Sequence, residues 1–113
     1  MKTIIAGSRG ITDFAVLLEA VEKCNFEITS VVSGRAAGVD YLGELYAEQN
    51  NLPLHKYPAE WNKYGRSAGP IRNKLMSENA EALLAIWDGN SAGTKNMIDN
   101  AKAKGLTIYV HMI

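Results

Sequence analysis

Thr3-Ile4-Ile5-Ala6-Gly7-Ser8-Arg9-Gly10 is the stretch that decides the fold. Its first four residues form a short apolar run that ends at a glycine, which is typical of a strand buried on both faces. Apolar residues with helical spacing follow Thr12 and Asp13, either of which can cap a helix; they are Phe14, Leu17, Leu18 and Val21. A buried strand, a glycine-containing turn and an amphipathic helix together form the first unit of a parallel α/β fold.

The same alternation continues along the chain. We expect strands at 28–33, 53–57, 83–87 and 107–112, helices at 39–50, 70–80 and 94–104, and a loop without clear periodicity at 58–69. In the helix at 70–80, the residues predicted to face the core are Ile71, Leu75 and Met76. Strands joined by crossover helices are parallel, and the crossovers are right-handed. We therefore predict one domain over residues 1–113, with a Rossmann-like, doubly wound parallel α/β sheet of five strands and the first strand between the second and fourth.

The composition argues against several classes of function. Of the 113 residues, 47% are hydrophobic and 21% are charged, which is ordinary for a globular protein. The net charge is zero, which disfavours bulk nucleic acid as a partner because binding to phosphates needs an excess of positive charge. No apolar run is long enough to span a membrane, and we see no secretory signal after Met1. Because Cys24 is the only cysteine, we expect no internal disulfide and no multi-cysteine zinc site. These features together predict a cytoplasmic location.

Glycine and arginine are concentrated in the predicted loops. All four arginines and eight of the ten glycines lie in or beside glycine-rich stretches. Glycine allows close approach of the backbone, and arginine offers a bidentate cationic fork, so the pair suits an anionic ligand. Three of these stretches follow predicted strands, and in parallel sheets ligands bind beyond the carboxyl ends of the strands.

The first two loops supply most of the candidate ligand-binding residues. In the first loop they are Gly7, Ser8 and Arg9; in the second they are Ser33, Gly34, Arg35 and Gly38, followed by Asp40 in the next helix. The first loop can equally be a plain turn. The start of the second helix would offer free N–H groups to an anion. Asp40 either stabilises that helix start or binds ligand hydroxyls or acts as a base. The dinucleotide fingerprint G-x-G-x-x-G is absent, so we do not expect NAD.

The later candidates are Arg72 and Asn73 in the helix at 70–80, and Gly93 and Thr94 in the third loop. That loop resembles a phosphate cradle, or is a capped loop, but it lacks the P-loop pattern. Trp61 and Tyr64 either stack on a base or cover the core. No His, Asp, Glu or Cys pair has the spacing of a metal site, so we expect neither a metal nor a cofactor.

The combination of Gly7–Gly10, Ser33–Asp40, Gly69–Met76 and Trp87–Thr94, in this order, resembles the YpsA-related branch of the SLOG superfamily. That superfamily includes the LOG-type phosphoribohydrolases and the DprA/Smf DNA-processing proteins. The resemblance implies a Rossmann-like domain that binds a nucleotide or a nucleotide-derived ligand. LOG-type enzymes cleave the N-glycosidic bond of nucleoside monophosphates with an arginine, which Arg72 matches, and a glutamate just after a glycine-rich loop.

At the positions where that glutamate belongs, this chain has Asn96 and Met97. An oxocarbenium-like transition state needs a nearby carboxylate, and Asp40, Glu60 and Asp88 are the candidate replacements. Two interpretations follow: a module that senses or sequesters a nucleotide-derived small molecule, or a nucleotide N-glycosidase. We also expect a homodimer, because a small domain with an exposed sheet edge often pairs with a second copy.

Overall fold

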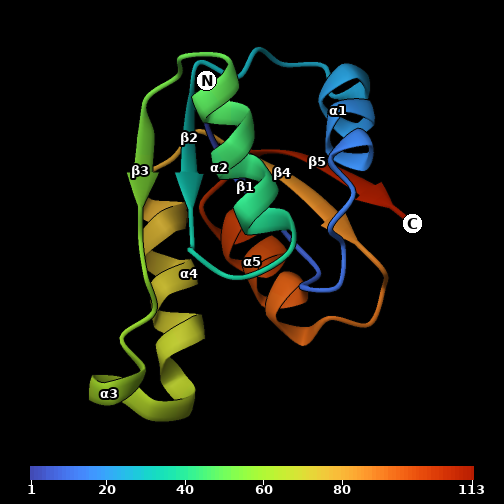
Figure 1. Ribbon diagram of the computed structural model, residues 1–113. Coiled ribbons are helices and arrows are strands. Elements are labelled where there is room, and N and C mark those ends of the chain that lie inside the picture. The colour runs from blue at the N-terminus through green and yellow to red at the C-terminus, as the bar shows by residue number, and fades with distance from the viewer.

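The computed structural model describes all residues from 1 to 113. The strands are β1 (Lys2–Gly7), β2 (Ser30–Ser33), β3 (Leu54–Lys56), β4 (Ala82–Trp87) and β5 (Thr107–Met112). The helices are α1 (Phe14–Lys23), α2 (Val39–Gln49), α3 (Trp61–Tyr64), α4 (Ala68–Glu78) and α5 (Ala92–Ala103), and a 3₁₀ turn, η1 (Gly65–Ser67), links α3 to α4. The five strands form one parallel sheet in the order β3-β2-β1-β4-β5 (Figure 1). This confirms the predicted fold class and the position of the first strand between the second and fourth.

Helices cover both faces of the sheet. One core cluster packs α1 and α2 against the sheet and includes Ile5, Leu17 and Leu84, whereas the other packs α4 and α5 against the opposite face and includes Ile4, Met76 and Met97 (Figure 1). Consecutive residues of β1 therefore face opposite clusters, as the period of two in a strand requires. This burial on both faces explains why β1 and β4 are continuous apolar runs rather than alternating ones.

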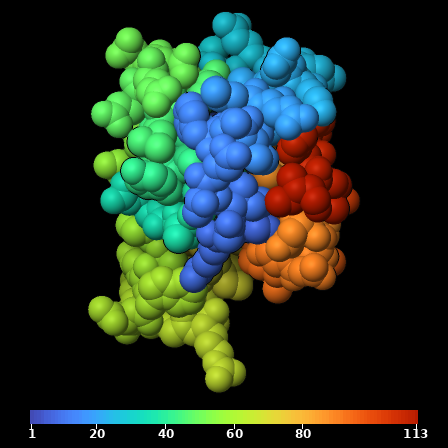
Figure 2. All heavy atoms as spheres, turned by 45° about the vertical axis from the view of Figure 1, so that its right-hand side comes forward, coloured from blue at the N-terminus to red at the C-terminus, as the bar shows by residue number.

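The segment at 58–69 differs from the prediction. It contains α3 and η1, and α4 begins at Ala68, two residues before Pro70. A helix of four residues is too short to show a helical period in the sequence, so the prediction of a loop was wrong here. In Figure 2 this yellow-green segment projects from the lower end of the molecule.

Helix α4 also faces the core with different residues from those predicted. Ile71 and Leu75 are 42% and 46% exposed, whereas Met76 is buried as predicted. Besides Met76, the buried residues of α4 are small or polar: Ala68, Gly69, Asn73 and Ser77. An apolar pattern could not identify this inward face, because the residues that α4 packs on α5 and presents to the cleft are mostly small or polar. In α1, Leu18 is likewise exposed rather than buried. No helix is long and apolar enough to cross a membrane.

Candidate functional site

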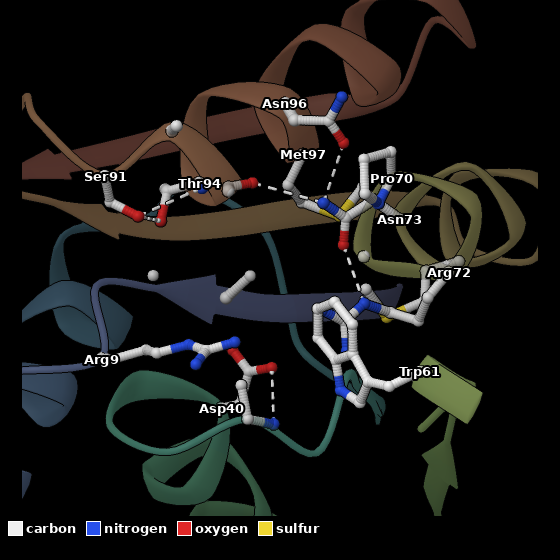
Figure 3. Close-up of a pocket in the computed structure, with 17 residues that line it drawn as sticks. Arg9, Asp40, Trp61, Pro70, Arg72, Asn73, Ser91, Thr94, Asn96 and Met97 are labelled. Atoms are coloured by element: carbon white, nitrogen blue, oxygen red, sulfur yellow. Dashed lines mark hydrogen bonds between the residues drawn. The ribbon is translucent and has the colours of Figure 1, made fainter. Parts of the chain in front are cut away.

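A cleft of about 290 Å³ lies at the carboxyl ends of the central strands. It receives residues from the β1–α1 loop, the start of α2, α3, α4 and the start of α5 (Figure 3). The segments that the sequence analysis singled out therefore meet, although they are distant along the chain. The volume is at the lower end of the range of small-molecule sites, about 300–1,000 Å³. That volume suits a small-molecule ligand.

The β1–α1 loop packs closely against the end of β4. A Cβ atom at Gly7 would lie 2.1 Å from the carbonyl oxygen of Ile86, so only glycine fits at the end of β1. Ser8 is buried, and its hydroxyl accepts a hydrogen bond from the N–H of Asp88 at 3.4 Å. Ser8 thus joins this loop to the β4–α5 loop and does not line the cleft. Arg9 is exposed, and its side chain extends into the cleft (Figure 3).

The β2–α2 loop is held by its own side chains. Ser33 donates a hydrogen bond to Glu44 at 2.7 Å and accepts one from the N–H of Arg35 at 3.1 Å. Arg35 has a positive φ of 66° and forms a 2.6 Å ion pair with Glu44. Such backbone strain persists only where the surrounding contacts impose it, as they do here.

The start of α2 is closed by the neighbouring loop. Gly38 has a φ of 77°, and a Cβ there would lie 2.5 Å from the carbonyl oxygens of Ser8 and Arg9. The N–H of Val39 donates to Ser8 at 3.5 Å. The expectation of an open helix start at this position is therefore wrong for Val39, because the protein's own backbone occupies the space.

Asp40 is a buried carboxylate that lines the cleft. It is 5% exposed, and its carboxylate accepts a hydrogen bond from the N–H of Ala36 at 3.2 Å. Burial raises the pKa of Asp40 to about 6, an effect that the Ala36 hydrogen bond and the charge of Arg72 partly oppose. Figure 3 shows the side chains of Arg9 and Asp40 pointing toward each other. Asp40 both stabilises the loop and presents a titratable group to the cleft.

Arg72 and Asn73 connect three elements. The guanidinium of Arg72 donates to the carbonyl oxygen of Gly34 through Nη1 and to the side chain of Asn73 through Nε at 3.0 Å. The amide nitrogen of Asn73 donates to Gly93 at 3.3 Å and to Asn96 at 2.9 Å. Burial lowers the pKa of Arg72 from its ordinary value, although the charge of Asp40 opposes this. The pair holds α4, the β2–α2 loop and α5 in one arrangement around the cleft.

The β4–α5 loop forms a capped but open helix start. The carboxylate of Asp88 accepts the N–H groups of Asn90 and Ser91 at 2.8 and 2.9 Å, and these bonds lower its pKa. Ser91 caps α5 by accepting from the N–H of Thr94 at 3.4 Å and from its hydroxyl at 3.0 Å.

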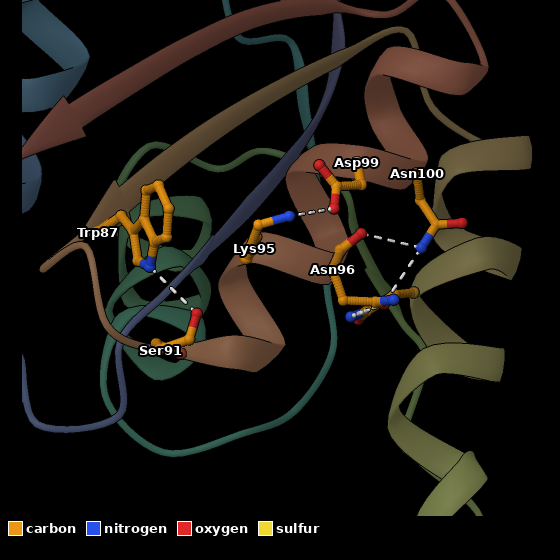
Figure 4. Close-up of polar contacts among 7 residues, drawn as sticks. Trp87, Ser91, Lys95, Asn96, Asp99 and Asn100 are labelled. Atoms are coloured by element: carbon orange, nitrogen blue, oxygen red, sulfur yellow. Dashed lines mark hydrogen bonds and ion pairs between the residues drawn. The ribbon is translucent and has the colours of Figure 1, made fainter.

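The indole of Trp87 fixes this cap further by donating to the carbonyl oxygen of Ser91 at 3.1 Å (Figure 4). The N–H groups of Ala92 and Gly93 donate to no atom of the protein, and a Cβ at Gly93 would meet nothing within 4 Å. The first turn of α5 can therefore offer these N–H groups, with the helix dipole, to an anion in the cleft.

The structure sorts the twelve predicted site residues into two groups. Seven line the cleft: Gly7, Arg9, Asp40, Arg72, Asn73, Gly93 and Thr94. The other five do not line it: Ser8, Ser33 and Gly38 support the loops behind it, and Gly34 and Arg35 line a smaller adjoining hollow. Of the three candidate carboxylates, only Asp40 lines the cleft, because Glu60 and Asp88 lie outside it. No group of three potential ligands could hold a metal ion.

Several lining residues were not among the predicted site residues. Trp61, Ser91, Asn96 and Met97 all line the cleft. Trp61 was considered for stacking, and an isolated tryptophan in a segment without periodicity was the signal that pointed to it. Asn96 was noted in the sequence only as standing at the position of the missing glutamate, and its hydrogen bond with Asn73 across two helices could not be predicted from spacing.

The comparisons with known proteins concern the first part of the chain. The model of the YspA, cpYpsA-related SLOG family (YAcAr) matches residues 1–64, which is more than half of the 113 residues. The match covers β1 to α3, and hence Arg9, Asp40 and Trp61, but it ends before Arg72 and the β4–α5 loop. No curated protein and no solved structure matches the chain. The chain belongs to the YspA, cpYpsA-related SLOG family.

Proposed function

We propose that this protein binds a nucleoside monophosphate, or a ligand derived from one, in the cleft at the carboxyl ends of its strands. The observation that carries the proposal is the convergence of an open helix start, two arginines and a buried carboxylate on one cleft of about 290 Å³. Family membership supports a nucleotide-related ligand. The protein would then act as a sensor or a sequestering module.

The first turn of α5 is the part of the cleft that suits the phosphate. Its free N–H groups at Ala92 and Gly93 lie beside the hydroxyl of Thr94, and a Cβ at Gly93 would have open space around it. Backbone N–H groups at a helix start bind phosphate without a P-loop lysine, through hydrogen bonds and the helix dipole. Arg72 lies on the neighbouring helix and adds positive charge to the same cleft.

The opposite part of the cleft suits a nucleoside. The carboxylate of Asp40 can accept hydrogen bonds from sugar hydroxyls, since it accepts only one hydrogen bond within the protein, from the N–H of Ala36. Trp61 is 51% exposed and lines the cleft together with Arg72 (Figure 3). An indole held in that position offers a face for a base to stack on.

Isothermal titration calorimetry with AMP tests the proposal. Gly93→Asp places a carboxylate where the phosphate would bind. The substitution should not destabilise α5, because an acidic residue in the first turn of a helix interacts favourably with the helix dipole. We expect AMP binding that Gly93→Asp weakens by about a hundredfold or more, because the phosphate then faces a like charge and loses its site. Gln49→Glu, at the exposed end of α2 and outside the cleft, adds the same charge and should keep the affinity. No heat of binding with AMP, GMP, CMP or UMP would refute the proposal.

The environment of Asp40 favours a second candidate function, hydrolysis of the N-glycosidic bond. A buried carboxyl with a pKa of about 6 suits acid–base chemistry near neutral pH, and Asp40 is the only acidic residue that lines the cleft. Chromatography of reactions with the four nucleoside monophosphates separates the two functions. Release of free base that disappears in Asp40→Asn identifies an N-glycosidase, whereas saturable binding without release identifies a binding module.

A further inference from the structure

A second hollow, of about 130 Å³, adjoins the main cleft. Three of its eight lining residues are arginines, Arg9, Arg35 and Arg72, and none is acidic. It shares Arg9, Ala36, Trp61 and Arg72 with the main cleft, so the two hollows meet along these residues. We refer to it below as the three-arginine hollow.

The charge of the three-arginine hollow differs from that of the main cleft. The main cleft contains the carboxylate of Asp40 between Arg9 and Arg72, whereas all the charged side chains that line the smaller hollow are cationic. Glu44 forms an ion pair with Arg35 but does not line the hollow. A concave surface with one sign of charge concentrates ions of the opposite sign.

The arginines keep donors for a ligand although two of them already have partners. Glu44 accepts from Nη1 of Arg35, and Gly34 accepts from Nη1 of Arg72. A guanidinium has five N–H donors, so each of these groups retains others. Arg9 has no hydrogen bond to the protein through its side chain and is exposed at the border of both hollows. The partners of Arg35 and Arg72 fix their positions in advance, which lowers the entropy cost of binding.

We propose that the three-arginine hollow binds a second anionic group of the same ligand, so that the ligand is a nucleotide with two phosphates on separate positions of the nucleoside. The inference depends on the proposed function, because it takes the first phosphate to lie at the start of α5. The sugar then lies near Asp40, between the two anionic groups. A nucleoside 3′,5′-bisphosphate has this arrangement, whereas a nucleoside diphosphate carries both phosphates on one side of the sugar.

Calorimetric titration with adenosine 3′,5′-bisphosphate, ADP and AMP tests the inference. We expect the bisphosphate to bind at least about tenfold more tightly than either AMP or ADP, since one charge-assisted contact accounts for that factor. Arg35→Gln should reduce the ratio of the two affinities, bisphosphate to AMP, to near one. Arg66→Gln is the matched control, because Arg66 is exposed on η1 and lines neither hollow, and it should leave the ratio unchanged.

A variant that increases the preference for the bisphosphate serves as a second test, because damage to the fold would weaken binding rather than strengthen it. Glu44→Gln removes the negative charge that competes for Arg35 and keeps an oxygen to accept from it, so the preference for the bisphosphate should increase. Thermal melting of each variant checks that it is folded.

The possible results separate the two proposals. If neither AMP nor the bisphosphate binds, the proposed function is wrong. If AMP binds but the bisphosphate binds no more tightly, or ADP binds as tightly as the bisphosphate, only the inference of a second, separate anion is overturned. It is also overturned if Arg35→Gln keeps the preference.

Discussion

The starts of α2 and α5 look alike in the sequence and differ in the structure. Each follows a buried parallel strand and a glycine-containing loop. At α2 the N-cap is Gly38, no side chain caps the helix, and the backbone of Ser8 and Arg9 lies against it. At α5 the N-cap is Ser91, its hydroxyl caps the helix, and the space around Gly93 is open.

The difference shows that a glycine-rich loop after a strand can serve two purposes. At α2, glycine permits close packing of one loop on another, so an anion near this loop must be bound by side chains such as Arg9 and Arg35. At α5, glycine leaves the backbone N–H groups accessible, so an anion can be bound by the main chain itself.

Glycine-to-alanine substitutions should give opposite results at the two helix starts. Gly38→Ala places a Cβ 2.5 Å from two backbone carbonyl oxygens at a φ of 77°, so we expect it to lower the free energy of unfolding by about 3 kcal/mol or more. Gly93→Ala, in a helical turn with open space, should raise that free energy by about 0.5 kcal/mol. Urea denaturation of both variants measures the difference, and equal effects would contradict the contrast.

The buried carboxylate beside α2 should make stability depend on pH. The pKa of Asp40 is raised from 3.8 to about 6 in the folded protein, so the folded state holds a proton that the unfolded state loses between pH 4 and 6. The contribution of Asp40 to the free energy of unfolding is thus fully present below pH 4 and is lost as the pH rises through 6. The loss is on the order of 3 kcal/mol.

The Asp40→Asn variant has no carboxyl group to titrate at this position. Its amide oxygen can still accept the hydrogen bond from the N–H of Ala36. The difference in the free energy of unfolding between the two proteins should therefore change across pH 4–6 in favour of the variant. Denaturation at several pH values measures it. A difference that does not vary with pH would show that the folded protein ionises Asp40 without a penalty.

Arg72 links the two helix starts, and its removal should weaken ligand binding. Losing a charge-assisted, partly buried contact costs roughly 1.5–3 kcal/mol, so Arg72→Ala should reduce AMP affinity about ten- to a hundredfold. Arg66→Ala removes an exposed arginine from η1 and is the control. An unchanged affinity in Arg72→Ala would mean that this guanidinium only supports the carbonyl oxygen of Gly34.

The smallest effect concerns the cap of α5. Ser91→Ala removes the acceptor for the N–H and the hydroxyl of Thr94 and should cost about 1 kcal/mol in the free energy of unfolding. Ser67→Ala is the matched control, because Ser67 stands at the N-cap of α4 but its side chain makes no capping hydrogen bond. Equal losses in the two variants would show that the observed cap contributes nothing.

Much of the fold could be predicted because it depends on local patterns. The apolar runs of β1 and β4 and the period of the apolar residues in α2 are visible in the sequence, and parallel strands follow from the helices between them. The pattern failed in α3, which is shorter than two helical turns, and in α4, whose inward face carries Asn73 and Ser77. Polar inward residues have no signature in a hydrophobic period.

The sequence by itself determined the order of the elements, the parallel sheet and the edge of the sheet at which the arginines and glycines gather, because strand direction fixes where each loop must lie. Only the tertiary structure decided which of these residues reach the cleft. Ser8 contacts the β4–α5 loop and Ser33 contacts Glu44 of α2, whereas Trp61 and Asn96 reach the cleft from elements distant in the sequence. Such contacts depend on how close the loops and helices pack in space, and spacing along the chain does not encode that distance.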